Sequence, residues 1–128
     1  MKIKAAVVYE VKGPFQVEMV ELDEPKAGEV LVKVASASVC HTDIASWDGS
    51  IPTPMPVVLG HEGSGIVEKV GPCVTKVAPG DHVVLTYPSC GHCAPCINGK
   101  PFACYNMMPY AFGGMMLDGT KRLGKDGQ

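Results

Sequence analysis

The sequence predicts a mostly β fold that forms a single domain. The 128-residue chain contains 15 glycines and 11 prolines, which favour turns between short strands and disfavour long helices. Several short segments alternate apolar with polar side chains, as expected of strands with one buried face. The length is enough for one hydrophobic core and too short for a second large domain within the same 128 residues.

The first half of the chain is predicted to form strands separated by turns. Residues 3–9 are apolar and rich in β-branched side chains, and residues 15–22 alternate apolar with polar side chains, which together predict a hairpin. Residues 30–35 repeat the alternation and predict a longer strand. The pattern then changes, and residues 41–47 are compatible with one or two helical turns that end at Gly49.

The second half of the chain shows weaker patterns. In residues 51–56 every second residue is proline, so this segment is expected to be an extended loop. Strand patterns return at residues 65–70 and 83–87. Residues 88–106 resemble a loop rich in cysteine, and residues 107–128 show no periodicity that predicts an element.

Charge and hydropathy exclude several classes of partner. The chain has 11 basic and 13 acidic residues and no dense basic run, which argues against nucleic acid or a membrane surface as its main partner. Residues 1–8 lack the apolar stretch of a signal peptide, and no apolar run approaches the roughly 20 residues of a membrane-spanning helix. We therefore expect a cytoplasmic protein with reduced thiols, in which clustered cysteines bind metal or take part in catalysis.

Four of the six cysteines form a C-x2-C-x2-C-x7-C pattern, in a lobe expected at about residues 88–106. The short spacings let tight turns bring the sulfurs to one tetrahedral zinc, each about 2.3 Å from the metal. Four thiolates complete the coordination sphere and leave no position for water, so we expect a structural zinc held by Cys90, Cys93, Cys96 and Cys104. His92, which lies inside the motif, is expected to face solvent.

This cysteine pattern has three other interpretations: two disulfides, an iron–sulfur cluster and a redox-active C-x-x-C pair. Disulfides conflict with the expected cytoplasmic setting, and the usual ferredoxin spacings differ from this one. A redox pair would need a βαβ setting, which the pattern of predicted strands lacks. Structural zinc is the interpretation that we prefer.

A second group of residues combines a thiol, an imidazole and two carboxyl groups. Cys40 follows the predicted strand at residues 30–35 and precedes Asp43 by three positions, and His61 is followed by Glu62. A thiolate and an imidazole together suit zinc, and nearby carboxylates can orient the ligands. The sequence does not show that the two segments meet, and each residue taken alone has an ordinary explanation, as a buried thiol or a turn histidine.

Taken together, these motifs resemble the zinc-dependent alcohol dehydrogenases of the medium-chain dehydrogenase/reductase superfamily. The resemblance covers essentially the whole chain, and its motifs are Cys-His-Thr-Asp at 40–43, Gly-His-Glu-Gly-Ser-Gly-Ile-Val at 60–67, Pro-Gly-Asp at 79–81 and the cysteine lobe. Tyr-Pro-Ser-Cys-Gly-His-Cys at 87–93 and Asp-Gly-Thr at 118–120 resemble the aryl- or benzyl-alcohol branch. The resemblance implies a GroES-like β-barrel, mostly antiparallel, with the zinc lobe projecting from it.

The resemblance also implies a catalytic zinc. Cys40 and His61 would be two of its three protein ligands, and Glu62 would lie behind the metal as an alternative ligand. Asp43 would orient one of these ligands. A zinc with one open position lowers the pKa of a bound alcohol, and the alkoxide then releases hydride to a nicotinamide.

Two further residues receive catalytic roles from the resemblance. Thr42 would hydrogen-bond the substrate hydroxyl and start the proton relay, and His41 would lie near the pyrophosphate of the cofactor. Some members carry a histidine five residues after the first ligand, where this chain has Ala45, so the relay would pass through Thr42 and either water or His41. Trp47, Thr86 and Tyr87 are expected either to line the substrate cleft or to pack within the barrel.

The chain departs from the family pattern in two respects. The third catalytic ligand would come from sequence beyond position 128, and the G-x-G-x-x-G fingerprint of a Rossmann domain is absent, while Cys73 has no expected role. We therefore expect residues 1–128 to be the N-terminal catalytic domain of a larger enzyme and to be inactive alone. The lobe is expected to hold zinc and the catalytic site to be partly filled or empty, since two or three ligands bind weakly.

The complete enzyme would oxidise an alcohol, or reduce the corresponding aldehyde or ketone, with NAD or NADP, and would act as a homo-oligomer. Two functions of other classes remain open. A non-enzymatic zinc-binding interaction module would carry a single zinc and lack a Rossmann domain even in the complete protein. A thiol redox protein would bind no stable metal and would cycle through its C-x-x-C pair.

Overall fold

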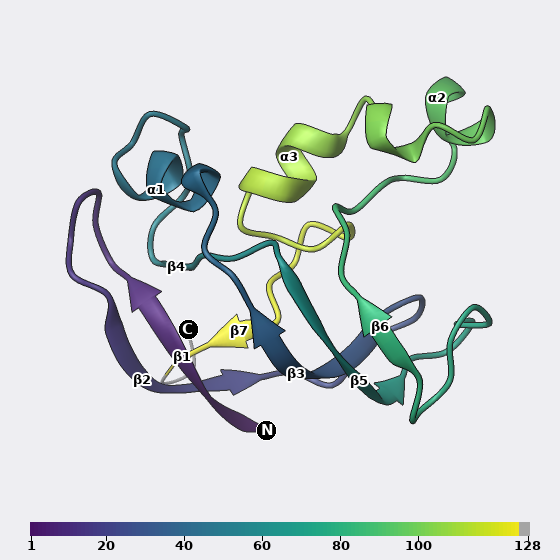
Figure 1. Cartoon of the computed structure of the whole chain (residues 1–128), viewed down its shortest axis with the longest axis horizontal. Helices are drawn as coiled ribbons and strands as arrows, with labels where there is room; N and C mark the ends of the chain where they lie inside the picture. The colour runs from purple at the N-terminus through teal and green to yellow at the C-terminus, as the bar shows by residue number, and fades with distance from the viewer. Residues whose placement is uncertain (126–128) are drawn as a thin grey trace.

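In the computed structural model, which describes residues 1–125, two antiparallel sheets form the body, and short helices gather at one end of them (Figure 1). The first sheet has the strand order β4-β1-β2-β7 and the second has the order β3-β5-β6. The strands are β1 (Lys2–Val8), β2 (Gln16–Leu22), β3 (Val30–Ala37), β4 (Val57–Val58), β5 (Gly63–Val70), β6 (His82–Val84) and β7 (Leu123–Gly124). The helices are α1 (His41–Trp47), α2 (Ala94–Ile97) and α3 (Met107–Phe112), with a 3-10 helix η1 at Pro101–Ala103.

The hairpin predicted at the start of the chain is confirmed. Strands β1 and β2 pair antiparallel from Lys2 opposite Glu21 to Val7 opposite Gln16. Alternate residues of β1 are the less exposed ones as far as the buried Val7, and Val8 at the end of the strand is also fully buried. This hairpin provides much of the core of the first sheet.

The long strand β3 pairs with β5, and this pairing contains two irregularities. The register shifts once between Leu31 and Val32 and again between Val34 and Ser36. Gly65 lies at this crowded point, where an added Cβ would come within 2.2 Å of the carbonyl oxygen of Lys33, so only glycine fits. The two irregularities decide which residues of β3 and β5 face each other at the end of the sheet.

The second half of the chain differs in part from the sequence prediction. The proline-rich segment at 51–56 is an extended loop as expected, but it leads into β4, whose two residues pair with β1. The strand predicted at 83–87 is shorter, because the chain leaves the sheet after β6 and turns toward the lobe. The segment expected to lack elements contains α3 and β7, and its last three residues, 126–128, lie outside the described part.

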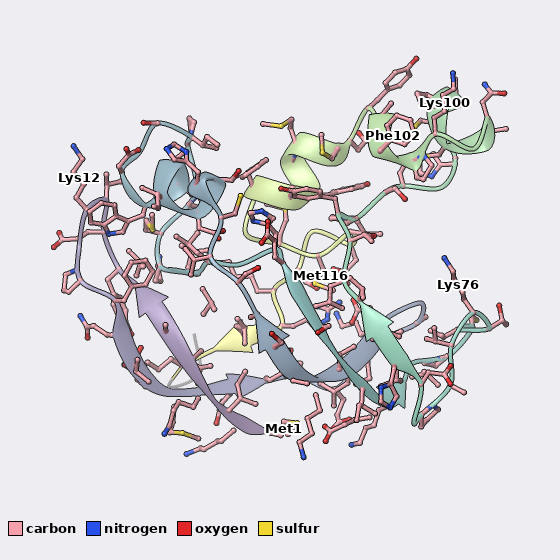
Figure 2. All side chains as sticks on the ribbon, viewed as in Figure 1. Met1, Lys12, Lys76, Lys100, Phe102 and Met116 are labelled. Atoms are coloured by element: carbon pink, nitrogen blue, oxygen red, sulfur yellow. The ribbon has the colours of Figure 1, made fainter. Side chains whose placement is uncertain are left out.

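The cysteine-rich segment is not a simple loop, because α2 and η1 form within it. These short helices lie at the outer end of a projection that extends away from the sheets (Figure 1). Phe102 and Lys100 lie on its surface in Figure 2, and Phe102 is 76% exposed. Among residues 1–125, no helix is long and apolar enough to cross a membrane.

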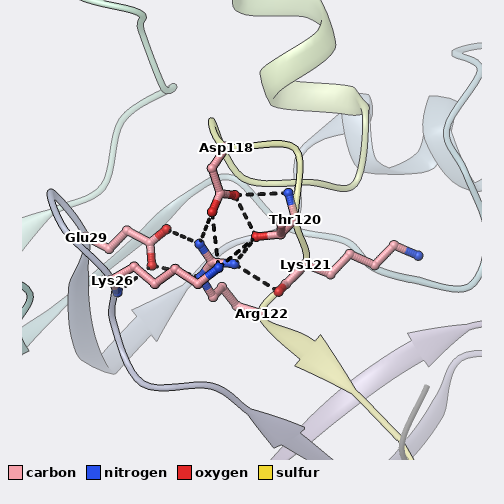
Figure 3. A network of polar contacts seen from close by, with 6 residues as sticks. All are labelled: Lys26, Glu29, Asp118, Thr120, Lys121 and Arg122. Atoms are coloured by element: carbon pink, nitrogen blue, oxygen red, sulfur yellow. Dashed lines mark hydrogen bonds and ion pairs between the residues drawn. The ribbon is translucent and has the colours of Figure 1, made fainter.

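The segment before β7 is fixed to the turn between β2 and β3 by a network of charged groups (Figure 3). The buried guanidinium of Arg122 donates two hydrogen bonds to Glu29, at 2.6 and 2.9 Å, and one to Asp118 at 2.9 Å. Lys26 donates to Asp118 at 3.2 Å and to Thr120 at 3.3 Å. Hydrogen bonds from Arg122 lower the pKa of Glu29, and those from Thr120, followed by Arg122, lower the pKa of Asp118.

Candidate functional site

The structure brings Cys40, His61 and Glu62 together at the end of the second sheet. Their potential ligand atoms, a sulfur, an imidazole nitrogen and a carboxylate oxygen, all lie within 4.8 Å of one another. Cys40 is the residue immediately before α1, and His61 and Glu62 immediately precede β5. The two segments that the sequence could not place together are therefore neighbours.

The pairing of β3 with β5 explains why these segments meet. The last residue of β3, Ala37, lies opposite the first residue of β5, Gly63. One residue further along, the backbone N–H of Ser38 donates to the carbonyl oxygen of Glu62 at 3.2 Å. The end of one strand and the start of the other thus deliver Cys40 and His61 to the same point.

Asp43 joins the two segments through a single carboxylate. Its Oδ2 accepts a hydrogen bond from the backbone N–H of Cys40 at 2.9 Å, and its Oδ1 lies 3.1 Å from Nδ1 of His61. Asp43 is buried, so neither contact is weakened by full exposure to water. A neutral imidazole that donates from Nδ1 to Asp43 keeps a lone pair on Nε2, which is the form that binds a metal through Nε2.

The ring of Tyr87 packs on the imidazole of His61. The two ring centroids are 5.2 Å apart and the planes are inclined by 17°. Partial burial, followed by the negative charges that Cys40, Asp43 and Glu62 can carry, raises the pKa of Tyr87. The phenol of Tyr87 therefore stays protonated beside the site. The stacking of its ring on His61 favours one orientation of the imidazole.

Glu62 lies beside His61 on the more exposed side of the group. Its Oε1 is 3.9 Å from Nε2 of His61, and its Oε2 accepts a hydrogen bond from the hydroxyl of Ser38 at 2.5 Å. This hydrogen bond is the main cause of the lowered pKa of Glu62. Glu62 is therefore a carboxylate at neutral pH, as a metal ligand must be.

The two residues expected to act in proton transfer lie on α1. The hydroxyl of Thr42 is 3.5 Å from the sulfur of Cys40, next to the potential ligands. His41 is exposed at the start of the helix. Trp47 instead donates from its indole nitrogen to the carbonyl oxygen of Gly13 at 2.7 Å, which makes it a packing residue between α1 and the turn after β1.

A cleft of about 400 Å³ opens beside this group. Its lining includes His61 and Glu62, the hydroxyl-bearing residues Ser36, Ser38 and Ser64, and the apolar side chains of Val84 and Leu85. The cleft therefore places the potential ligands and three hydroxyl groups beside apolar side chains. Such a surface fits a small molecule that carries both polar and apolar groups.

The four cysteines of the lobe form a second group of potential ligands. The sulfurs of Cys90, Cys93, Cys96 and Cys104 all lie within 4.8 Å of one another. The sulfurs of Cys93 and Cys104 are 4.0 Å apart, close to the roughly 3.8 Å that a tetrahedron with zinc–sulfur bonds of about 2.3 Å requires. The spacing of the sulfurs fits a single tetrahedral metal.

Backbone N–H groups of the lobe point at the sulfurs of Cys90 and Cys104, whereas burial raises the pKa of Cys96 to about 12. The N–H groups of Cys90 and Asn106 both point at the sulfur of Cys104 from 3.4 Å. Hydrogen bonds from the backbone, mainly at His92, lower the pKa of Cys90 to about 6, so this thiol ionises readily. Such N–H groups stabilise thiolates, which are the form of cysteine that binds zinc.

The remaining sequence candidates lie outside both groups. His92 is exposed as expected, with Nδ1 2.7 Å from the carbonyl oxygen of Cys90. Cys73 is exposed and lies in neither group of potential ligands. Sequence reasoning missed Ser38, because its contact with Glu62 depends on the irregular pairing of β3 with β5, which no local pattern reveals.

Comparison with known proteins gives a consistent result. Residues 26–122 match the model of the family described as "Alcohol dehydrogenase GroES-like domain". The chain is 50% identical over 121 residues to geraniol dehydrogenase of Castellaniella defragrans, covering 94% of this chain and 32% of that protein. It is 45% identical over 128 residues to the NDMA-dependent alcohol dehydrogenase of Amycolatopsis methanolica, covering 99% of this chain and 34% of that protein.

Solved structures show the same fold. An alcohol dehydrogenase zinc-binding domain protein of Burkholderia ambifaria matches with a TM-score of 0.95 and 44% identity, over 100% of this chain and 35% of that one. Benzyl alcohol dehydrogenase of Acinetobacter calcoaceticus matches with a TM-score of 0.92 and 42% identity, over 96% of this chain and 34% of that one. The expected GroES-like fold with a four-cysteine lobe is confirmed, and the chain spans about a third of the length of the relatives it matches.

Proposed function

Because the chain belongs to the alcohol dehydrogenase GroES-like domain family, we propose that it is the N-terminal catalytic domain of a zinc-dependent alcohol dehydrogenase. The observation that carries this proposal is the group formed by Cys40, His61 and Glu62, with Asp43 holding the first two in place. A thiolate, an imidazole and a carboxylate form the mixed donor set of a catalytic zinc, whereas the lobe offers four thiolates and no open position.

In the proposed site, Cys40 and His61 would hold the catalytic zinc, with Glu62 as an alternative ligand. When bound, zinc acts as a Lewis acid that lowers the pKa of an alcohol hydroxyl. In the neutral imidazole, a hydrogen bond from Nδ1 of His61 to Asp43 leaves the lone pair on Nε2 for the metal, and Tyr87 stacks on the face of the ring. The hydroxyl of Thr42, 3.5 Å from the sulfur of Cys40, would accept a hydrogen bond from the alcohol hydroxyl and, as it takes up that proton, pass its own proton on to water or His41.

The lobe has a different part in this proposal. Cys90, Cys93, Cys96 and Cys104 would hold a structural zinc that contributes to folding and takes no part in the reaction. The backbone N–H groups around Cys104 support that role, because they stabilise the thiolate form.

The remaining two thirds of the complete protein would supply the other components. We propose that they contain a Rossmann domain that binds NAD or NADP, with His41 near the pyrophosphate of the cofactor. Relatives named for geraniol and for benzyl alcohol support a small primary alcohol, such as an aromatic one, as the substrate. The complete enzyme would be cytoplasmic and homo-oligomeric, and the 128-residue chain would be inactive because it cannot hold the hydride acceptor.

Two measurements test this proposal. The 128-residue chain should contain zinc in its lobe and should not oxidise benzyl alcohol with NAD or NADP, whereas the complete protein should oxidise it and should lose that activity when Cys40 is replaced by serine. Turnover by the 128-residue chain, or full activity of the C40S enzyme, would contradict the proposal. A thiol redox protein would contain no stable metal, and a non-enzymatic zinc module would be inactive even as the complete protein.

A further inference from the structure

Glu62 is the least restrained of the three potential ligands at the catalytic site. Cys40 is fixed by its position at the start of α1 and by the contact of its N–H with Asp43. His61 is fixed on one side by Asp43 and on its face by Tyr87. The side chain of Glu62 is 45% exposed, and a long carboxylate side chain at such a surface samples many rotamers unless another group holds it.

Ser38 holds Glu62 at two points. The backbone N–H of Ser38 donates to the carbonyl oxygen of Glu62 at 3.2 Å, which fixes the backbone of Glu62 against the end of β3. The hydroxyl of Ser38 donates to Oε2 of Glu62 at 2.5 Å, which fixes the side chain. Both contacts come from Ser38, so the carboxylate and the backbone of Glu62 are held against the same residue.

The contact with Ser38 also decides which oxygen of Glu62 faces the potential ligands. Because Oε2 is engaged by the hydroxyl, Oε1 is left 3.9 Å from Nε2 of His61. A metal bound by Nε2 would therefore find Oε1 within reach, and the carboxylate would not have to be reoriented. A ligand that is already in position loses less conformational entropy when the metal binds.

We propose that Ser38 is a positioning residue that presents Glu62 to the metal, so that the chain closes a three-ligand site from its own residues. The inference rests on the proposed catalytic zinc site, and it adds Ser38, to which the sequence motifs assign no role. Replacing Ser38 by alanine removes the hydroxyl and leaves the backbone contact. Groups that hold metal ligands in place typically contribute about 10-fold to 100-fold in metal affinity.

The test is a cobalt titration of the 128-residue chain whose lobe has first been filled with zinc. Cobalt bound to the thiolate of Cys40 gives an absorption band that reports this site directly, without any assay of activity. We expect S38A to weaken cobalt binding about tenfold or more. S38T, which keeps a hydroxyl, should retain most of the affinity, and S36A, which removes a neighbouring hydroxyl of the same cleft, should bind as the unsubstituted chain does.

A double substitution separates positioning of Glu62 from a general structural effect. If Ser38 acts through Glu62, S38A should have no further effect on cobalt affinity in a chain that already carries E62A. A loss of affinity in S38A that persists in the E62A background would overturn the inference, as would equal affinities of S38A and the unsubstituted chain. Failure of the unsubstituted chain to bind cobalt at all would overturn the inference that this chain closes a three-ligand site from its own residues, whereas the proposed function is decided separately by the activity of the complete protein and of its C40S variant. Circular dichroism of each variant confirms that the fold is retained.

Discussion

Replacing Asp43 by asparagine tests the most connected residue of the candidate site. The two carboxylate oxygens of Asp43 have different partners, the N–H of Cys40 at 2.9 Å and Nδ1 of His61 at 3.1 Å. Asparagine offers one oxygen and one NH2 group. If its oxygen keeps the contact with Cys40, its NH2 faces Nδ1 of His61, which must then accept a hydrogen bond and leave the proton on Nε2.

The protonated Nε2 cannot bind a metal, so D43N should weaken the site selectively. A hydrogen bond to a charged group contributes about 1.5–3 kcal/mol, and about 1.4 kcal/mol corresponds to a factor of ten. Loss of one such hydrogen bond therefore corresponds to a fall in metal affinity of about 10-fold to 100-fold. The same range is expected for a carboxylate that orients a metal-bound histidine. Zinc in the lobe should be unaffected.

The assay is the same cobalt titration of the zinc-filled chain, with D48N as the matched control. Asp48 lies at the other end of α1 and accepts a hydrogen bond from the N–H of Ser50 at 2.8 Å, so D48N makes the same chemical change on the same helix. D48N should bind cobalt as the unsubstituted chain does. Equal cobalt affinities of D43N and the unsubstituted chain would refute the reasoning from the tautomer of His61. An equal loss in D48N would point to the helix as a whole.

Three further predictions follow from the fold. C104S should release the zinc of the lobe and lower the midpoint of thermal unfolding, measured by metal analysis and calorimetry, whereas C73S should change neither because Cys73 is exposed and outside both groups. G71A should lower the urea midpoint or prevent folding, because a Cβ at this position would come within 1.8 Å of the carbonyl oxygen of Lys26; an unchanged midpoint would contradict the close contact. Because Arg122 lowers the pKa of Glu29 in the folded state, this pair stabilises the fold above the unfolded pKa of about 4.3 and ceases to do so as the pH falls through the folded pKa. The urea midpoint should therefore fall less between neutral and acidic pH in R122Q than in the unsubstituted chain, and equal falls in both proteins would exclude the pair as a cause.

Sequence patterns predicted the helices and strands that are determined by their own residues. The alternation of residues 15–22 correctly predicted a strand, since β2 forms there. It predicted the wrong buried face, because Val20 is buried whereas Phe15, Val17 and Met19 are exposed. Strand β4 could not be predicted, because it has two residues and exists only through its pairing with β1. Helix α3 also escaped prediction, because the periodicity of its six residues is too short to recognise.

The candidate site also has features that local motifs predict and features that depend on the pairing of distant strands. The cysteine spacing is a local signal, and its four sulfurs do lie together. Cys40 and His61 could be named from their motifs, but their proximity follows from the pairing of β3 with β5. The contact of Ser38 with Glu62 could not be predicted even from the pairing of β3 with β5 alone. It depends on two shifts of register, which alter which residues lie opposite each other.

The pairing of β7 with β2 has a consequence for the order in which the protein folds during synthesis. The hairpin of β1 and β2 closes over a short stretch of chain, whereas the contact of Arg122 with Glu29 joins residues 93 positions apart. Contacts between distant residues form later than local ones, and a ribosome releases the N-terminal strands first. The nascent chain therefore leaves the edge of β2 at Glu21 and Leu22 unpaired until Leu123 and Gly124 have been made. The exposed charge of Glu21 on this strand would hinder pairing with other nascent chains during that interval.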